Sequence, residues 1–269
     1  MHPMERLRYV ARAGSGDTAL IVGETVEAIA RLRPGPAELV TLCRQLVQRN
    51  PTCGPLWWLG SRLLSGDVED LWDLVDEVDE DPTADHLVDA VPDGSRVLTI
   101  GCPDIASRAL ARRGDIEVLA VDAGAGAAAF MRALDRADVP VRSVDVTALP
   151  SAAARADLVV VEVAACSTAV GLAAVGNALL SVVAAATAAP RVVVTGVGTR
   201  LPDAYVDTIV ARSIDPDAPW SADVERIDLT AFDADRDLVV GPAGAGPVGA
   251  ETLRPDCPFV PELIPPSPA

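Results

Sequence analysis

The chain has 269 residues, of which 50% are hydrophobic and 23% charged, with 22 basic against 39 acidic side chains. The half-apolar composition argues against disorder over the whole chain, and the length suits one large domain or two small ones. The formal net charge of −17 repels phosphate backbones and anionic lipid headgroups, which argues against nucleic-acid binding through a basic face.

Cysteine, histidine and lysine usage narrows the chemistry further. The five cysteines are widely spaced with no CxxC pair, and neither of the two histidines has a cysteine at zinc-binding spacing. We therefore predict no metal site, no disulfide framework and a reducing, cytoplasmic location. The N-terminus has no apolar signal core, and every basic residue is arginine, so no lysine can form a Schiff base.

The first part of the chain, residues 1–91, is predicted to form a small helical domain. Apolar residues recur at helical spacing in three stretches: 17–32, 39–47 and 55–59. Pro34 and Pro51 mark the breaks between these helices. A further helix is predicted over 67–81, whose many carboxylates indicate a face in contact with water.

The second part, residues 92–269, is predicted to form a Rossmann-like α/β domain. Five short β-branched runs alternate with stretches that can form helices, which predicts βαβ crossovers and a parallel sheet. These runs are 95–100, 116–121, 139–144, 156–163 and 191–197. Two later runs, 224–229 and 237–242, are expected to extend the sheet, the glycine-rich stretch 241–249 to form a flexible loop, and the proline-rich end a loose or docked tail.

An uncharged stretch from Ala164 to Pro190 is long enough to span a bilayer. It is rich in alanine, glycine, serine and threonine and lies between two strand-like runs, so we interpret it as a helix buried against the sheet and predict no membrane span. The helix expected at Gly171–Ala188 is more apolar than covering one sheet face requires. It is therefore our predicted homodimer surface.

Parallel sheets bind ligands beyond the carboxyl ends of their strands, so the residues that follow each strand are the site candidates. After the first strand come Thr99, Gly101, Cys102 and Asp104. One glycine is too few for a dinucleotide loop, so no cofactor is predicted. Cys102 is a nucleophile candidate whose pKa a helix N-terminus would lower, or else a small packed residue.

Other strands contribute further candidates. Glu162, in the fourth strand, is either a general base or the partner of a buried arginine. Cys166 could face the crevice and meet Cys102. After the fifth strand, Gly196 and Gly198 would let backbone amides approach a ligand, and Arg200 is either a phosphate clamp or a surface arginine.

The second strand ends at Asp122, which supports an alternative function. The VLTIGC and VLAVDA runs are similar to the opening of an S-adenosylmethionine-dependent methyltransferase, in which an acidic residue at this position binds the ribose hydroxyls. Pro103-Asp104 stands where those enzymes have a second glycine.

Four segments in order resemble one family, which contains the regulatory subunits of eukaryotic translation initiation factor 2B, methylthioribose-1-phosphate isomerase and ribose-1,5-bisphosphate isomerase. They are SGDTALIVGETVEAIARL, NPTCGPLWWL, DGSRVLTIGC and ADLVVVEVAACSTAVGLAAVGNALLSVVAAA. The resemblance implies a helical N-terminal domain, a Rossmann-like C-terminal domain and dimerisation through the latter. It also implies a sugar-phosphate site at the strand ends, with Asn50 and Thr52 closing it from the helical domain.

The sequence departs from the family where the isomerases have catalytic groups. Gly101 stands where the isomerases have their cysteine, with Cys102 one residue later. The stretch from Glu162 to Ala165 has no counterpart of the catalytic aspartate, and the phosphate-loop arginine is missing after Asp122. The sequence thus favours a non-catalytic, homodimeric binding or regulatory protein for a small metabolite such as a sugar phosphate or nucleotide. An isomerase that uses Cys102 and Glu162 in shifted geometry and the methyltransferase are the enzyme alternatives.

Overall fold

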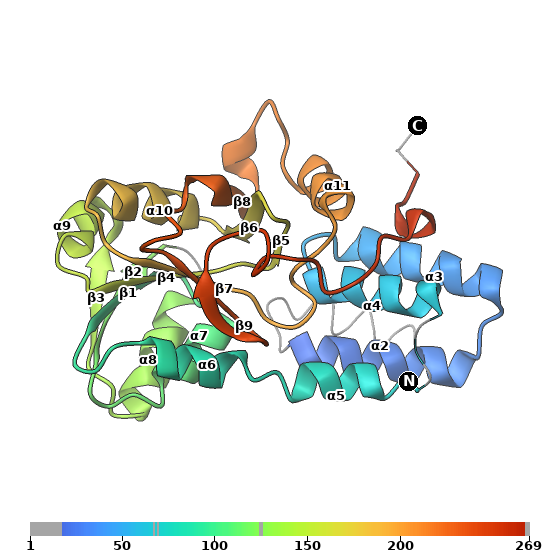
Figure 1. Ribbon diagram of the computed structural model, residues 1–269, viewed down its shortest axis with the longest axis horizontal. Helices are drawn as coiled ribbons and strands as arrows, with labels where there is room; N and C mark the ends of the chain where they lie inside the picture. The colour runs from blue at the N-terminus through green and yellow to red at the C-terminus, as the bar shows by residue number, and fades with distance from the viewer. Residues whose placement is uncertain (1–17, 67, 69, 124–125, 267–269) are drawn as a thin grey trace.

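The computed structural model describes residues 18–66, 68, 70–123 and 126–266, and shows a helical part beside an α/β part (Figure 1). The helical part consists of α2 (Thr18–Leu32), α3 (Pro36–Arg49), α4 (Gly54–Ser65) and α5 (Asp73–Asp79). These helices share a core with Trp57 and Trp58 of α4, both almost fully buried. Burial of two indole rings contributes strongly to the stability of so small a helical unit.

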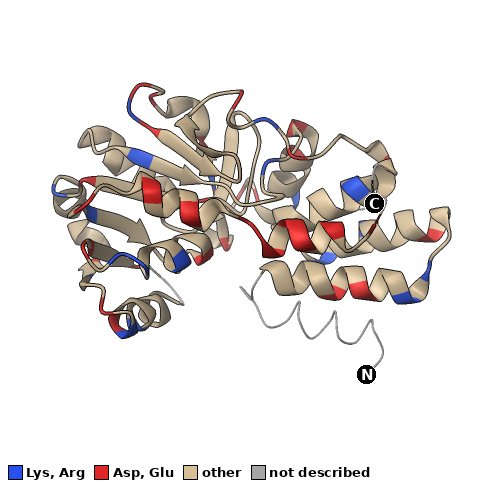
Figure 2. Cartoon of the chain, turned by 60° about the horizontal axis from the view of Figure 1, so that its bottom comes forward, with Lys and Arg blue, Asp and Glu red and all other residues tan. Residues whose placement is uncertain are grey.

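The helix predicted over 67–81 is shorter in the structure. Within the described residues of this stretch, helix α5 spans only Asp73–Asp79, and Leu74 and Val78 are its buried residues. Its carboxylates are exposed, as the sequence predicted, and Figure 2 shows them along this helix. Arg62 of α4 reaches one of them, Glu77, with a nitrogen–oxygen distance of 3.2 Å.

The main sheet has seven strands in the order β10-β9-β7-β4-β1-β2-β3. Their bounds are β1 (Arg96–Ile100), β2 (Glu117–Asp122), β3 (Val141–Asp145), β4 (Leu158–Glu162), β7 (Arg191–Val194), β9 (Leu238–Gly241) and β10 (Gly244–Pro247). All neighbours pair in parallel except β9 and β10. The chain leaves β1 in one direction and returns at β4 on the other side, which is the Rossmann arrangement with its switch point between these two strands.

Helices cover both faces of this sheet, which explains the unbroken apolar runs of its strands. Helices α6 (Thr83–Ala90), α7 (Asp104–Leu110) and α8 (Ala127–Arg136) cover one face. Helices α9 (Leu149–Ala153) and α10 (Asn177–Ala186) cover the other (Figure 1). Alternate residues of each strand face the two layers; in β4, Val160 packs on the α7 side and Val161 on the α10 side.

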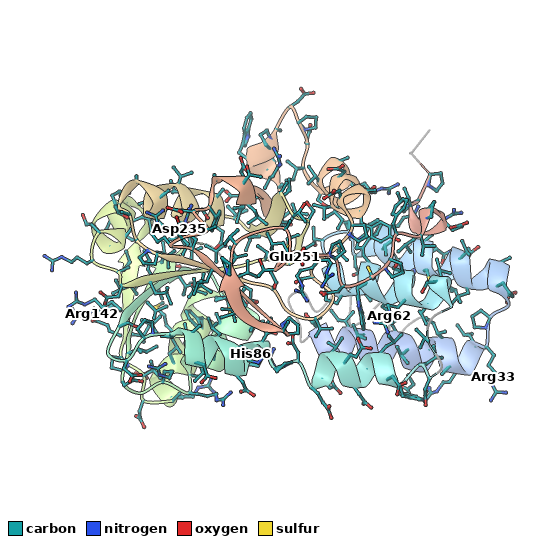
Figure 3. The ribbon with its side chains drawn as sticks, in the orientation of Figure 1. Arg33, Arg62, His86, Arg142, Asp235 and Glu251 are labelled. Carbon is teal, nitrogen blue, oxygen red and sulfur yellow. The ribbon has the colours of Figure 1, made fainter. Side chains whose placement is uncertain are left out.

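Helix α6 packs with the sheet although the predicted boundary between the domains lies after it. Its buried Ala84 and Leu87 belong to the same apolar cluster as α7 and α8. His86 lies beside the end of β9, where its Nδ1–H donates to the carbonyl oxygen of Gly241 over 2.9 Å (Figure 3). The helical part that is separate from the sheet therefore ends near residue 81.

The stretch predicted as one helix from Gly171 to Ala188 begins instead with a strand. After β4 the chain forms β5 (Ala165–Cys166) and β6 (Val170–Ala174), which pair antiparallel, and only then α10. Gly176, with φ of +98°, separates β6 from α10. The expectation of a continuous helix was wrong because small apolar residues carry no periodicity that distinguishes a short buried strand from a helix.

Two expectations about the later strands were also wrong. Strand β8 (Val224–Asp228) does not extend the main sheet but pairs antiparallel with β6, which completes a small sheet of three strands. The predicted flexible loop 241–249 contains β10, which folds back on β9 as an edge hairpin. Of the two later runs, 237–242 does extend the main sheet, as β9.

The chain returns to the helical part at its C-terminal end. Helix α11 (Asp203–Ser213) buries Tyr205, Val206 and Ile209 in the cluster of α2–α4, and the short helix η4 (Pro261–Leu263) adds Leu263. The tail is thus docked as far as residue 266. The remaining 3-10 turns are η1 (Val146–Ala148), η2 (Pro219–Ser221) and η3 (Leu229–Ala231). None of the described helices is long and apolar enough to cross a membrane.

Candidate functional site

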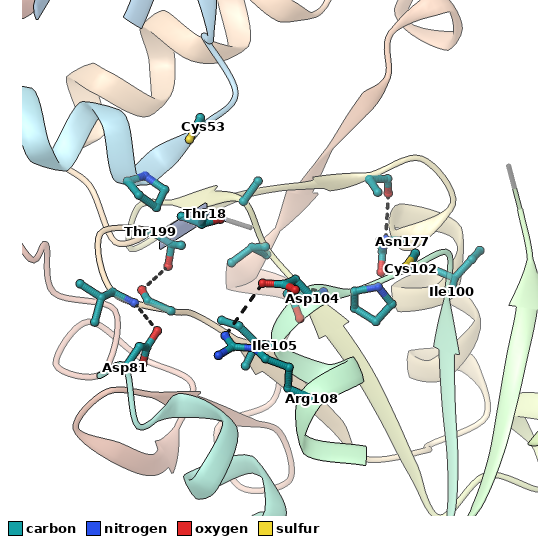
Figure 4. A pocket seen from close by; sticks show the side chains of 18 residues that line it. Thr18, Cys53, Asp81, Ile100, Cys102, Asp104, Ile105, Arg108, Asn177 and Thr199 are labelled. Atoms are coloured by element: carbon teal, nitrogen blue, oxygen red, sulfur yellow. Dashed lines mark hydrogen bonds and ion pairs between the residues drawn. The ribbon is translucent and has the colours of Figure 1, made fainter. Parts of the chain in front are cut away.

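A cleft of about 280 Å³ lies between the helical part and the carboxyl ends of β1, β4 and β7 (Figure 4). This is the switch point of the sheet, where Rossmann-like proteins bind their ligands. The walls come from both parts of the chain. They are formed by Thr18, Cys53, Pro55, Asp81, Ile100, Cys102, Pro103, Asp104, Ile105, Arg108, Glu162, Val163, Ala164, Ala174, Asn177, Gly196, Val197 and Thr199.

Gly54 holds the helical part against the floor of this cleft. Its amide donates to the carbonyl oxygen of Ala164 over 3.2 Å. A Cβ at this position would lie 2.4 Å from that same oxygen, so only glycine allows the two segments to approach this closely.

Glu162, the last residue of β4, places its carboxylate against the first turn of α7. Oε1 accepts from the amide of Asp104 over 2.8 Å, and Oε2 accepts from the amide of Ala106 over 2.9 Å. Removal from water raises the pKa of this carboxyl to about 7, although hydrogen bonds from the α7 amides act in the opposite direction. The side chain is therefore an internal cap of α7, and no arginine within the described ranges pairs with it.

The carboxylate of Asp81, which also lines the cleft, likewise accepts hydrogen bonds from backbone amides. Its Oδ1 accepts from the amide of Thr83 and its Oδ2 from the amide of Val197, each over 2.9 Å. The second of these bonds connects the end of the helical part to the loop that follows β7. Gly196 makes room for this contact, because a Cβ there would lie 2.9 Å from Oδ2 of Asp81.

The charge of the cleft is predominantly negative. Asp81, Asp104 and Glu162 contribute carboxyl groups, and Arg108 is the one basic side chain among the described residues that line it. Arg108 lies 3.9 Å from the carboxylate of Asp104, one turn earlier in α7, and both side chains are about half exposed (Figure 4). The single guanidinium is therefore shared with a carboxylate of the same wall.

Buried polar side chains from α10 and the β7–α11 loop complete the walls. Asn177 is 4% exposed and donates its side-chain amide to the carbonyl oxygen of Ala174 over 2.9 Å. Thr199 is 7% exposed and donates its hydroxyl to Gly196 over 2.8 Å. The N-terminus of α10 is capped by Glu225, whose Oε2 accepts from the amides of Gly176 and Ala178.

Cys102 is exposed in the loop between β1 and α7, and it lines the cleft. Partial burial raises the pKa of its thiol, and the carboxylates of Asp104 and Glu162 raise it further. The expected lowering by a helix N-terminus is therefore wrong. The amides of Asp104 and Ala106 in the first turn of α7 bind Glu162, and the charges that act on the thiol are the carboxylates of Asp104 and Glu162.

Cys166 does not face the cleft. It is fully buried in β5, and burial raises the pKa of its thiol to about 12. Its backbone pairs with the loop on either side of Arg200, accepting from Leu201 and donating to Thr199 over 2.7 Å each. The expected meeting of Cys102 and Cys166 is therefore wrong, because one thiol is exposed in the cleft and the other is inside the protein.

Arg200 also lies outside the cleft. Its guanidinium pairs with the carboxylate of Asp256 and donates to the carbonyl oxygen of Thr252 over 3.0 Å. These groups line a separate hollow of about 410 Å³ beside the β9–β10 hairpin. The structure thus places the expected phosphate clamp at a different surface, where it fixes the C-terminal segment.

The other predicted site residues divide between the cleft and its surroundings. Cys102, Asp104, Glu162 and Gly196 line it. Six more are not among its lining residues: buried Thr99 in β1, Gly101 and Gly198 in turns with positive φ, exposed Asp122 at the end of β2, and Asn50 and Thr52 just before α4. From the helical part, Cys53 and Pro55 line the cleft in place of Asn50 and Thr52.

Sequence reasoning missed Asp81, Arg108 and Asn177. Each carries a local signal: Asp81 precedes a Pro-Thr pair that starts a helix, Arg108 follows Asp104 by four residues, and Asn177 follows the glycine that begins α10. None of these signals indicates that the side chain faces a cleft. That placement depends on the packing of the helical part on the sheet.

Neither a family model nor a curated protein matches the sequence. Solved structures do match. One is eIF2B beta from Chaetomium thermophilum, with a TM-score of 0.69 and 15% identity over 97% of this chain and 91% of that one. Another is the translation initiation factor eIF-2B from Pyrococcus horikoshii, with a TM-score of 0.72 and 12% identity over 94% and 98%. This chain has the eIF2B fold.

Further matches cover the same architecture. eIF2B delta from C. thermophilum aligns with a TM-score of 0.66 and 14% identity over 89% of this chain and 96% of that one. The resemblance read from the sequence is thereby confirmed for the fold, including the helical part followed by a Rossmann-like sheet. A further matching structure is a tetrameric complex of eIF2B beta and eIF2B delta from C. thermophilum.

Proposed function

We propose that this eIF2B-like protein binds a small metabolite in the cleft and acts as a binding or regulatory protein without catalysing a reaction. One observation carries the proposal. The carboxylate of Glu162, the cleft residue best suited to act as a base, is bound by two backbone amides of α7 through both of its oxygens. Protonation of a base held in this way weakens the charge-assisted hydrogen bonds that it accepts, which opposes proton transfer from a ligand.

The position that corresponds to the catalytic aspartate of the isomerases offers no second carboxyl group. By the resemblance to the isomerases, their catalytic aspartate falls in the stretch around Ala164, which lines the cleft with a methyl group. Proton transfer between neighbouring carbons of a sugar needs an acid and a base, and loss of one of them costs roughly 10²–10⁴-fold. A cleft that is retained while the acid–base pair of the isomerases is missing supports a function in binding a ligand.

We test binding with ribose 5-phosphate, adenosine, S-adenosylmethionine and agmatine in thermal-shift measurements. At least one of these probes is expected to raise Tm, and Ala164→Phe, which fills the cleft, is expected to abolish the shift. Ala154→Phe, at an exposed position after α9, serves as the matched control. Failure of every probe to raise Tm would contradict the proposal.

We further propose a homodimer that forms through α10. Among its outward residues, Leu179 and Val182 are 46% and 67% exposed, and the preceding Val175 is 45% exposed. Helix α10 contains no charged residue. An apolar face of this kind on a soluble protein marks a contact surface. A cytoplasmic location, predicted from cysteine usage, belongs to the same proposal.

Light scattering tests the dimer. The protein is expected to be dimeric at micromolar concentration, and Leu179→Asp is expected to be monomeric because it places a charge in the interface. Val146→Asp, at a 39% exposed apolar position in η1, is the control and should remain dimeric. A monomeric parent protein would refute this part of the proposal.

An isomerase that uses Cys102 and Glu162 is the second candidate, because both side chains line the same cleft and the carboxyl has a pKa of about 7. That value suits a general base at neutral pH. Incubation with ribose 5-phosphate in D₂O, followed by NMR, decides between the two. Deuterium at carbon 2 that disappears in Glu162→Gln would establish the isomerase, whereas no exchange is expected for a binding protein.

The methyltransferase alternative has less geometric support. Asp122, expected to bind the cofactor ribose, is exposed at the end of β2 and does not line the cleft among the described residues. Stabilisation by S-adenosylmethionine that is lost in Asp122→Ala would revive it.

A further inference from the structure

The hydrogen-bonding groups that remain free in the cleft are mainly acceptors. Each carboxylate oxygen of Glu162 accepts one amide hydrogen and keeps a second lone pair. Oδ2 of Asp81 is in the same state, with the amide of Val197 as its one donor. Asp104, which faces the cleft from α7, binds Arg108 only at 3.9 Å. Three carboxyl groups therefore retain capacity for donors.

Several backbone donors that could hold a phosphate already bind carboxylates of the protein. A phosphate in a Rossmann-like crevice is held by backbone amides at helix N-termini and by the turns that follow strands. Here the amides of Asp104 and Ala106 bind Glu162, and the amide of Val197 binds Asp81. At α10 the amides of Gly176 and Ala178 bind Glu225. Carboxylates of the protein occupy the places where a ligand anion would bind.

A buried amide provides a second, independent indication. Asn177 is 4% exposed, and its side-chain nitrogen donates to Ala174. Its side-chain oxygen accepts no hydrogen bond from any described residue, and Asn177 is one of the residues that line the cleft (Figure 4). A donor from a ligand would satisfy this oxygen.

The charge balance of the lining points the same way. Three carboxyl groups face one guanidinium, which already pairs with Asp104. Much of the remaining lining is apolar, with Ile100, Ile105, Val163 and Val197 among its residues. A volume of about 280 Å³ is at the small end of ligand sites. The ligand is therefore a small molecule with an apolar body and a donor-rich head.

We infer that the cleft binds a small organic cation, a primary amine or guanidinium compound, whose charged head is held by Glu162, Asp104 and Asn177. This inference rests on the proposed function of the cleft as a binding site and specifies the class of ligand. It replaces the phosphorylated ligand expected from the sequence. Alkyl ammonium and guanidinium groups carry only donors, which complements these acceptors.

The proposal has a pH signature. The charged groups that share the cleft with Glu162 are Asp104 and Arg108 of α7 and Asp81 of the helical part, together with the thiol of Cys102. The pKa of Glu162 is about 7, so roughly one carboxyl in ten is ionised at pH 6 and nine in ten at pH 8. A bound cation requires the ionised form. Affinity should therefore rise about tenfold from pH 6 to pH 8, with proton release on binding below pH 7.

Three probes with one apolar body separate the ligand classes: n-butylamine, n-butanol and n-butyl phosphate. Only the amine is expected to raise Tm. In calorimetry its binding enthalpy should change between buffers of different ionisation enthalpy at pH 6.5, and this dependence should be lost in Glu162→Gln. Asp104→Asn, at a side chain that is 59% exposed, should weaken amine binding about tenfold or more. Asp235→Asn, which removes an exposed charge elsewhere, is the matched control.

Arg108→Ala decides between the outcomes. Amine binding should survive this change or become tighter, because a competing cation is removed. Stabilisation by n-butyl phosphate that is lost in Arg108→Ala would overturn the inference while leaving a metabolite-binding cleft intact. Absence of a shift with the amine, the phosphate and the four probes of the proposed function would overturn both.

Discussion

Arg191 at the start of β7 and Asp237 just before β9 form an ion pair from which water is excluded. The two side chains are 2% and 0% exposed, and Nε of Arg191 lies 3.0 Å from Oδ2 of Asp237. The guanidinium also donates to the carbonyl oxygens of Ser181 and Ala231 and lies 3.8 Å from the centre of the Phe232 ring. The pair thus connects two neighbouring strands to the middle of α10 and to η3.

Removal of Asp237 should therefore be strongly destabilising. Asp237→Ala leaves a buried guanidinium without its counter-charge, which costs about 3–5 kcal/mol of unfolding free energy. Urea denaturation measures this loss, with the exposed Asp235→Asn, two residues away, as a control that changes stability by less than about 0.5 kcal/mol. Equal stabilities of the two variants would show that the pair is dispensable.

The stabilisation by the Arg191–Asp237 pair should be lost at low pH, when the Asp237 carboxyl is protonated. Burial alone raises its pKa, but hydrogen bonds from the Arg191 side chain and the Asp233 amide outweigh burial and leave the pKa below its usual value. The pair therefore stabilises the fold above the unfolded-state pKa of about 3.9, and the contribution is lost as pH falls through the lower folded-state value.

Glu162 should have the opposite dependence on pH. Its pKa is raised from 4.5 to about 7, so between these values the folded protein holds a proton that the unfolded chain has released. The contribution of the protonated Glu162 carboxyl to the unfolding free energy is fully present below pH 4.5. It is lost as pH rises through 7, where the folded protein releases this proton. The difference in unfolding free energy amounts to about 3 kcal/mol.

Glu162→Gln removes this titration. Urea denaturation between pH 5 and pH 8 should show a flatter dependence of unfolding free energy on pH for the variant than for the parent protein. Asp235→Asn, which removes an exposed carboxylate, should preserve the parent slope. If all three profiles run parallel, the carboxyl of Glu162 does not titrate in this range.

The close approach of Gly54 to Ala164 predicts a loss of stability on adding one methyl group. A Cβ at Gly54 would lie 2.4 Å from the carbonyl oxygen of Ala164, and 3.3 Å from Cα of Thr199. Because both neighbours are backbone, Gly54→Ala must push the helical part away from β4, at a cost of about 1–3 kcal/mol. Gly114→Ala is the control, since a Cβ there meets nothing within 4 Å. Thermal denaturation of both variants tests the contact, and equal Tm values would contradict it.

The strands of the main sheet could be predicted because burial on both faces leaves a strong local signal. Val159, Val160 and Val161 alternate between two layers, and both layers require an apolar side chain. The order of the helical part and the sheet part could also be predicted, because apolar residues recur at helical spacing in the first part and form short continuous runs in the second. Strand β6 could not be predicted, since Val170–Ala174 differs little in composition from the helix that follows it.

The sequence could predict where the candidate site lies but not which side chains face it. The carboxyl ends of β1, β4 and β7 lie at one edge by the rule for parallel sheets, which placed Cys102, Asp104, Glu162 and Gly196 together. The direction of each side chain depends on partners distant in sequence. Arg200 turns away from the cleft because Asp256, 56 residues later, pairs with it. Asp81 is held at the site because its carboxylate accepts a hydrogen bond from the amide of Val197, 116 residues later.

Of the five cysteines, Cys102 is exposed, Cys53 is partly buried in the cleft wall and the other three are buried. Burial raises the pKa of the Cys53 thiol to about 11, so Cys102 should react alone in the folded protein near neutral pH. Partial burial and the carboxylates of Asp104 and Glu162 raise the pKa of its thiol, which predicts slow alkylation by iodoacetamide at pH 7 and a rate that increases beyond pH 9. Mass spectrometry should show one label on the native protein, none on Cys102→Ser, and five on the parent protein in urea. Asp104→Asn should accelerate the reaction several-fold at pH 8 because it removes a negative charge beside the thiolate, whereas Asp235→Asn should leave the rate unchanged. Fast labelling at pH 7 would instead mean that the amides of α7 stabilise the thiolate, and the assignment of those amides to Glu162 would then fail.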